Sequence, residues 1–392
     1  GGRRFGDVMT TGAEGADTRH TGNPPCLRNH IPLGAPATRE PCTGEEPRVR
    51  VSLGFTPRWY RARLGVDFGE QWHTDPEYRY DSLRSMKQIL HEQFPDVSYF
   101  PPRKMDHVDA TCATISGVYG IMVIPSLYGL PIDYRSDNWP DVAGGVHLSK
   151  SELAATVASG PLDLDAAPAF RALEAQMDRI ETKWGQIHGY LNYQGVLNIA
   201  LKLRGNEIFL DMFDDPEFAR SLFSHIAATI ERVSKRVQAR QRRSGFDVDL
   251  LSMSNCVINM ISPQQYEEFL LPLDRELSMK YARFGVHTCN WDATPYFDAL
   301  STINSLGYLD TGIDADLPRM RRQFPNTRRA VMYSPVKLEQ ASVEEIRSDI
   351  ERLDAELAPC DLVMADVENT TPDERVGELL NIVSQITGEP AT

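Results

Sequence analysis

The sequence has 392 residues and a mass of 44.1 kDa, and with 41% hydrophobic residues it can bury a substantial core. Its 41 Lys and Arg residues are outnumbered by 55 Asp and Glu residues, and the net charge of -14 repels nucleic-acid phosphates and anionic lipids. Because it also shows neither an apolar run of about 18 residues nor a signal-peptide pattern, we expect a cytoplasmic protein that acts on a small molecule, as a homodimer if it self-associates.

Residues 1–50 are rich in Gly and Pro and poor in large apolar side chains, which predicts an irregular arm. The remainder, 51–392, is predicted to be one barrel domain that begins with a helical extension. The six cysteines are too few and too scattered for a disulfide scaffold, so each of them is available as a free thiol or a metal ligand.

In the first half of the chain, residues 81–91 carry the periodicity of an amphipathic helix. Apolar runs at 119–124 and 189–193 predict two buried strands. Asp215 and Pro216 are typical of the first residues of a helix, and the apolar spacing that follows predicts a long helix that Gly245 ends.

The second half repeats one unit, an apolar strand followed by a polar turn and a capped helix. The predicted strands are 248–253, 283–287, 307–310, 329–333 and 361–365. Such alternation predicts parallel strands covered by helices. Because no Gly-x-Gly-x-x-Gly motif follows the early strands, we favour an α/β fold with an eight-stranded parallel TIM-type barrel over an open dinucleotide-binding sheet. In that barrel, reactive residues lie at the carboxyl ends of the strands.

His287 and Cys289 follow one of these strands and lie two residues apart, so both side chains point to the same side. One imidazole and one thiolate are ligands that suit zinc. For the third ligand, Cys256 and Asp310 follow other strands at the same end of the barrel. Cys360 begins the last strand, roughly 17 to 20 Å below that end, and is expected to be a core thiol.

The preferred further metal ligands are two acidic residues just past the last strand, Asp366 and Glu368, although capping or solvent exposure would explain either residue alone. Asp310 is assigned a catalytic role or, alternatively, a hydrogen bond to His287. The residues assigned to substrate binding are Tyr193, Asn255 and Trp291.

Five further segments are 193–205, 214–218, 261–269 with Pro272, 287–289 and 371–372. Together they resemble the uroporphyrinogen decarboxylase superfamily, which includes the zinc-dependent methylcobamide:thiol methyltransferases. The resemblance covers roughly residues 115–388 and implies the barrel fold.

Two differences argue against the decarboxylase itself. Residues 123–126 contain no acidic residue where that enzyme has its catalytic Asp, and its Gly-His-Gly segment is replaced by residues 365–368. In the methyltransferase branch, the resemblance implies that His287 and Cys289 bind zinc together with a Cys after the last strand. Here that place is acidic, so the third ligand stays open.

The resemblance therefore implies zinc-dependent transfer of a methyl group between a corrinoid and a small thiol, methyl ether or methylamine. The corrinoid would be free cobalamin or bound to a partner protein. A carboxylate ligand would make the zinc harder and favour oxygen-bearing substrates, and hence demethylation. Two alternatives remain, a decarboxylase of a tetrapyrrole carboxylate that needs no metal, and a non-catalytic corrinoid- or tetrapyrrole-binding protein.

Overall fold

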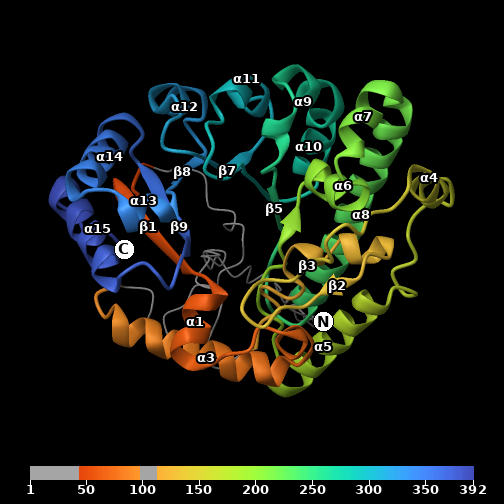
Figure 1. Cartoon of the computed structure of the whole chain (residues 1–392), viewed down its shortest axis with the longest axis horizontal. Helices are drawn as coiled ribbons and strands as arrows, with labels where there is room; N and C mark the ends of the chain where they lie inside the picture. Colours follow the sequence, from red (N-terminus) through yellow and green to blue (C-terminus); the bar gives the residue numbers. More distant parts are fainter. Residues whose placement is uncertain (1–43, 98–112) are drawn as a thin grey trace, which may run out of the picture.

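The computed structural model describes residues 44–97 and 113–392, so most of the expected arm at 1–50 lies outside the described residues. Seven parallel strands form one sheet in the order β1-β9-β8-β7-β6-β5-β4. Figure 1 shows this sheet curving into a ring with helices around it, which confirms the α/β barrel class. The strands are β1 (Val49–Phe55), β4 (Tyr193–Gln194), β5 (Leu250–Ser254), β6 (Arg283–His287), β7 (Leu306–Thr311), β8 (Arg328–Met332) and β9 (Cys360–Val367).

The helices cover the outside of the ring and connect successive strands. They are α1 (Pro57–Leu64), α2 (Glu70–Thr74), α3 (Pro76–Gln93), α4 (Lys150–Ala158), α5 (Pro168–Trp184), α6 (Val196–Arg204), α7 (Glu207–Asp214), α8 (Pro216–Arg243), α9 (Pro263–Phe269), α10 (Leu271–Ser278), α11 (Phe297–Leu300), α12 (Leu317–Gln323), α13 (Pro335–Gln340), α14 (Val343–Glu356) and α15 (Asp373–Thr387). The predicted long helix is α8, capped by Asp215, and the predicted helix at 81–91 is part of α3. None of the helices that the structure describes is long and apolar enough to cross a bilayer.

The sheet has seven strands rather than the expected eight among the described residues. Outside these strands, Thr114 forms an isolated parallel bridge with His188. The strand predicted at 119–124 is wrong: this apolar run forms turns and a short 3-10 helix, η1 (Gly120–Met122). Tyr119 has a φ of 61° and Gly120 a φ of 50°, and such left-handed residues interrupt extended backbone. A small hairpin follows, β2 (Ile132–Asp133) with β3 (Asp141–Val142).

The strands separate two apolar clusters. The large core lies between the strands and the helices, and it includes Leu309, Val331 and Leu362. A second cluster alternates with these residues along β7, β8 and β9 and therefore fills the inside of the barrel. Its members are Tyr308, Ala330, Met332, Val363 and Ala365.

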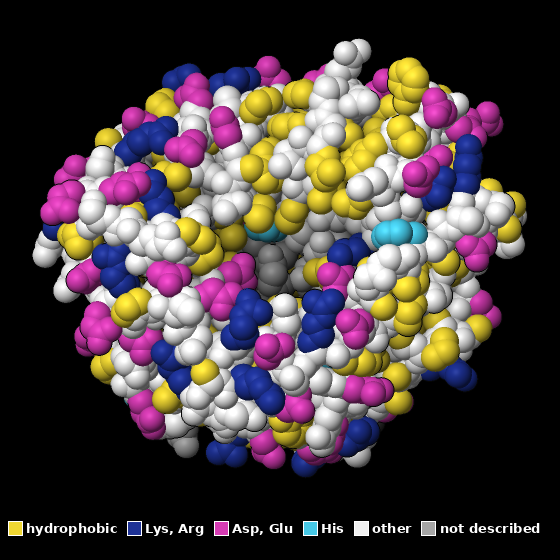
Figure 2. Space-filling view, viewed as in Figure 1, with side chains coloured by type: hydrophobic (Ala, Val, Ile, Leu, Met, Phe, Trp, Pro, Cys, Tyr) yellow, Lys and Arg dark blue, Asp and Glu magenta, His cyan; other side chains and the backbone are white. Residues whose placement is uncertain are grey.

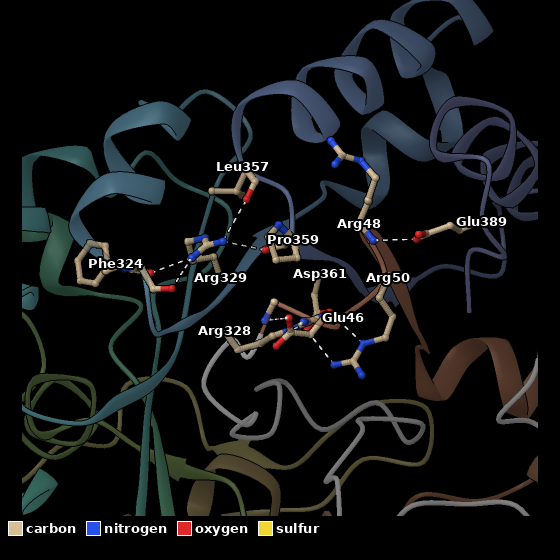
Figure 3. Close-up of polar contacts among 12 residues, drawn as sticks. Glu46, Arg48, Arg50, Phe324, Arg328, Arg329, Leu357, Pro359, Asp361 and Glu389 are labelled. Carbon is tan, nitrogen blue, oxygen red and sulfur yellow. Dashed lines mark hydrogen bonds and ion pairs between the residues drawn. The ribbon is translucent and has the colours of Figure 1, made fainter.

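Ion pairs join the strands where they begin. The carboxylate of Asp361 lies 2.6 Å from Nη2 of Arg328 and 3.0 Å from Nε of Arg50, linking β9 to β8 and β1 (Figure 3). Asp361 is fully buried and shares its charge with two guanidinium groups, as a buried ion requires. Nearby, the backbone N–H of Arg48 donates to the carboxylate of Glu389 at 3.0 Å, so the C-terminal residues lie beside the start of β1.

Candidate metal centre

Three side chains meet at the carboxyl ends of two neighbouring strands. His287 is the last residue of β6, Cys289 follows it, and Cys256 lies in the turn after β5. Ser254 pairs with His287, and the backbone N–H of Asn255 donates to the carbonyl of His287 at 2.7 Å, so the two strand ends are level. One ligand atom from each of the three residues lies within 4.8 Å of the other two.

This group fits a zinc ion. In a tetrahedral site with Zn–S bonds of about 2.3 Å, neighbouring sulfur ligands lie about 3.7 Å apart. The observed limit of 4.8 Å is somewhat wider, so small rotations of the side chains would bring the three atoms to bonding distance. Two sulfurs and one nitrogen are donors that zinc prefers, and three protein ligands leave the fourth position for a substrate.

Asp310, in β7, orients the imidazole. Its Oδ2 lies 2.6 Å from Nδ1 of His287, and the hydroxyl of Tyr308 donates to the same oxygen at 3.0 Å. An ionised carboxylate only accepts, so Nδ1 carries the proton and Nε2 is left as the ligand atom. Asp310 and Tyr308 are two residues apart and both point into the barrel, where Asp310 is fully buried.

The backbone after β6 turns sharply around the same carboxylate. Cys289 has a φ of 82°, which is uncommon for a residue with a side chain. In this conformation the N–H groups of Thr288 and Cys289 both donate to Oδ1 of Asp310, at 2.7 and 3.3 Å. One buried aspartate therefore fixes both the imidazole and the peptide that carries the second cysteine.

The three side chains interact electrostatically. A hydrogen bond from Cys256, followed by contacts with His287, lowers the pKa of Cys289 to about 4. The same hydrogen bond and burial raise the pKa of Cys256. Burial opposes charge on His287, but the charge of Asp310 and the hydrogen bonds of His287 with Asp310 and Cys256 outweigh it and raise the pKa of His287 well above its usual range. Without metal, the centre therefore holds one thiolate and two protonated partners.

The two acidic residues that we expected to be ligands lie outside this group of three. Glu368 binds Arg58 of α1, with Oε1 2.5 Å from Nη2, and accepts a hydrogen bond from Thr56 at 3.1 Å. Asp366 is exposed to solvent on one side. The surrounding protein nevertheless raises its pKa to about 6, and the charge of Cys289 contributes to this increase.

A bulge in β9 explains why Asp366 is close enough to sense that charge. The register shifts between Leu53 and Phe55 of β1, which pair with Met364 and Val367 of β9. Met364 and Val367 both belong to the outer core, so the two residues between them turn toward the barrel interior.

Two of the three residues assigned to substrate binding, Asn255 and Trp291, support the cysteine turns. Asn255 is buried and donates from Nδ2 to Asp274 at 2.9 Å, and Trp291 donates from Nε1 to the carbonyl of Cys256 at 2.9 Å. Tyr193 in β4 is buried against Tyr190, with ring centroids 5.4 Å apart, and burial raises its pKa well above the usual range. Contact of these side chains with a substrate stays a prediction.

Cys360 is fully buried at the start of β9, as the strand register predicted. Sequence reasoning left Cys256 among several options because it lies far from His287 along the chain. It missed the bonds of Thr288 and Tyr308 to Asp310. The spacing of Tyr308 and Asp310, two residues apart on a strand, was the available signal.

No protein-family model and no curated protein matches the chain. Among solved structures, the chain is similar to a methyltransferase from Methanosarcina mazei, with 14% identity over 90% of this chain and 96% of that one, and a TM-score of 0.57. A B12-independent methionine synthase from Shewanella sp. W3-18-1 aligns with 12% identity over 87% and 96% of the two chains, with a TM-score of 0.43. At these identities, the similarity to the first structure shows a shared fold.

Proposed function

We propose that the protein is a zinc-dependent methyltransferase, in which Cys256, His287 and Cys289 hold the metal and a small thiol accepts the methyl group. The convergence of these three side chains carries the proposal, since their ligand atoms lie within 4.8 Å of one another at the carboxyl ends of the strands. The fold shared with the Methanosarcina mazei methyltransferase adds weaker support.

The identity of the proposed metal ligands indicates which methyl acceptor suits the site. Two thiolates balance the charge of Zn²⁺, and sulfur donors make the site soft, so a sulfur acceptor suits it better than an oxygen one. The expectation of a hard site with a carboxylate ligand, and with it the preference for demethylation of oxygen substrates, gives way to this assignment. Zinc bound here would lower the pKa of an acceptor thiol and present it as a thiolate.

The protein's own residues prepare the site for that step. Asp310 keeps the proton on Nδ1 of His287, and the Thr288 and Cys289 N–H groups that donate to Asp310 keep the ligand loop in place. Cys289 is partly exposed, so a small molecule can approach the metal from the mouth of the barrel. Figure 2 shows the molecule hollowed at the centre of the ring, with charged side chains along the lower side of the hollow and mainly hydrophobic side chains along its upper side.

Asp366 is the group we assign to proton transfer. Its carboxylate interacts with the charges of both Cys289 and His287 and has access to solvent. With a pKa near 6 it is ionised at neutral pH and is a base of suitable strength for the proton that an acceptor thiol loses. A corrinoid, free or on a partner protein, remains our proposal for the methyl carrier.

The test is the metal content of purified variants. We expect one zinc per chain in the wild type and loss of zinc in Cys256→Ala, His287→Ala and Cys289→Ala. Two controls, Glu368→Ala and Cys360→Ala, should retain it. A metal-free wild type, or zinc retained in Cys256→Ala and lost in Glu368→Ala, would contradict the proposed ligand set.

Activity is tested separately with methylcobalamin and a small thiol. We expect methyl transfer to the thiol by the zinc-loaded wild type and none by Cys289→Ala. Decarboxylation of a tetrapyrrole acid by metal-free protein would support the decarboxylase instead.

A further inference from the structure

Three polar side chains lie side by side on the inner face of the sheet, at the level of the metal centre. Gln194 of β4 pairs with Ser254 of β5, and Ser254 pairs with His287 of β6. In each of these strands the preceding residue belongs to the outer core, so the three side chains point into the barrel. We call Gln194, Ser254 and His287 the polar row.

The polar row includes a proposed zinc ligand, so its other members lie close to any molecule bound to the metal. Paired residues on neighbouring strands are about 4.8 Å apart. Ser254 is therefore next to His287, and it lies two residues before Cys256. Backbone bonds keep the strand ends level, because the N–H of Gly195 donates to the carbonyl of Ser254 at 2.8 Å and the N–H of Asn255 donates to that of His287 at 2.7 Å.

The hydroxyl of Ser254 is buried and unused. The residue is 1% exposed, and its Oγ has no hydrogen-bond partner within the described ranges 44–97 and 113–392. A buried polar group without a partner costs free energy of folding, so such groups are uncommon unless a ligand or a water completes them. The place of this hydroxyl, beside a proposed zinc ligand, indicates that a molecule bound at the metal supplies its partner.

Gln194 adds a second hydrogen-bond donor to the polar row. Its Oε1 accepts from Nδ2 of Asn198 at 3.0 Å, and its Nε2 donates to Oδ1 of Asn192 at 3.2 Å. These two bonds hold the amide in place and occupy its oxygen. They use one of its two N–H groups, and the other makes no hydrogen bond to a residue that the structure describes. Ser254 and Gln194 can therefore both donate to a bound molecule.

Two uncharged donors suit an uncharged oxygen. A hydroxyl or carbonyl oxygen accepts hydrogen bonds from Ser254 and Gln194 without bringing charge into the barrel. A buried anion would need a cation beside it, and neither of these side chains carries a charge. Asp366 adds repulsion against an anion, because its carboxylate is ionised at neutral pH and interacts with the charges of the metal centre.

We propose that Ser254 and Gln194 bind the methyl acceptor, and that this acceptor is a small thiol with an uncharged oxygen a short carbon chain away from its sulfur. The inference deepens the proposed function and rests on it, because the sulfur of the same molecule binds the zinc. The hydroxyl of Ser254 and the amide of Gln194 donate to the oxygen. Attachment at both ends orients the sulfur for attack on the methyl carbon.

The experiment measures binding of three thiols to the zinc-loaded full chain by calorimetry. The hydroxyl is present in 2-mercaptoethanol, is replaced by a methyl group of similar size in 1-propanethiol, and is replaced by a carboxylate in 3-mercaptopropionate. We expect 2-mercaptoethanol to bind about five- to tenfold more tightly than either of the others, as one or two buried hydrogen bonds would allow. Equal binding of 2-mercaptoethanol and 1-propanethiol, or tighter binding of 3-mercaptopropionate, overturns the proposal.

Two variants test the residues of the polar row. Ser254→Ala should keep zinc and lose the five- to tenfold preference for 2-mercaptoethanol over 1-propanethiol, and Gln194→Met should lower that preference about two- to fivefold. Because the Ser254 hydroxyl has no partner among the described residues, Ser254→Ala should not lower the denaturant midpoint. A preference that survives in Ser254→Ala overturns the proposal, and one that survives in Gln194→Met removes Gln194 from it.

The matched control is Ser82→Ala. Ser82 is a buried serine of α3 whose Oγ donates within its own helix to the carbonyl of Tyr78 at 2.8 Å. This variant removes the same hydroxyl group outside the metal centre and should keep the full preference for 2-mercaptoethanol. Loss of the preference in this control as well would overturn the assignment to Ser254.

The measurements separate this proposal from the proposed function. A zinc-loaded wild type that methylates 2-mercaptoethanol and 1-propanethiol equally well refutes the role of the polar row alone. A wild type that prefers 2-mercaptoethanol, loses this preference in Ser254→Ala and transfers no methyl group refutes the proposed methyl transfer alone. A chain that binds no zinc overturns both, because the polar row acts on a metal-bound molecule.

Discussion

Replacing Asp310 by Asn tests the metal centre with a minimal change of shape. The carboxylate accepts a hydrogen bond from Nδ1 of His287 at 2.6 Å and further hydrogen bonds from the backbone N–H groups of Thr288 and Cys289. An Asn side chain can keep its oxygen on the two N–H groups only by turning its NH₂ toward Nδ1. The proton of the imidazole then moves to Nε2, the atom that should bind zinc.

The size of the effect follows from the bond that is lost. A hydrogen bond to a charged group contributes about 1.5–3 kcal/mol, which corresponds to roughly a 10- to 150-fold change in an equilibrium constant. Loss of a partner that orients a metal-bound histidine typically costs about 10- to 100-fold in metal affinity. We therefore expect Asp310→Asn to weaken zinc binding by about 10- to 100-fold, measured by competition with a chromogenic chelator.

The control is Asp274→Asn, another buried aspartate close to the centre. Asp274 accepts from Asn255 at 2.9 Å and from the hydroxyl of Tyr266 at 2.6 Å, and burial raises its pKa to about 6. A neutral amide oxygen can accept both bonds, so zinc affinity should change by less than about twofold. The reasoning is refuted if folded Asp310→Asn binds zinc as tightly as this control.

Two further predictions concern protons and packing. At pH 7, Cys289 is ionised, because its pKa is about 4, whereas Cys256 and His287, whose pKa values are raised, are protonated. Zinc binding should therefore release about two protons and weaken as the pH falls, measured by calorimetry in buffers of different ionisation enthalpy; release of none would contradict the coupled pKa values. Gly312→Ala should lower the free energy of unfolding by about 1–3 kcal/mol and weaken zinc binding, because its Cβ would lie 2.2 Å from the carbonyl oxygen of Asn290. An unchanged denaturant midpoint would contradict that packing.

Hydrophobic periodicity correctly predicted the strands and helices whose buried residues follow a regular pattern. The strand at 283–287 matches β6, and α8 begins at Asp215 and Pro216 as predicted. The first strand, β1, escaped notice because Arg50 and Ser52 interrupt its apolar residues. The apolar run at 119–124 was misread because hydrophobicity cannot distinguish a buried strand from buried turns.

The site was harder to predict than the fold. His287 and Cys289 share one strand end, so their spacing was informative. The third residue of the group, Cys256, was harder to identify because its position beside His287 depends on the strand register between β5 and β6. Likewise, Glu368 is held by Arg58, a residue 310 positions earlier in the chain, which no local pattern could reveal.

The contact between Arg48 and Glu389 has a practical consequence. It places the start of β1 beside residue 389, where the strands begin, whereas the proposed zinc ligands lie where the strands end. A support or fusion domain attached beside this contact would therefore leave the rim with the proposed zinc ligands facing outward.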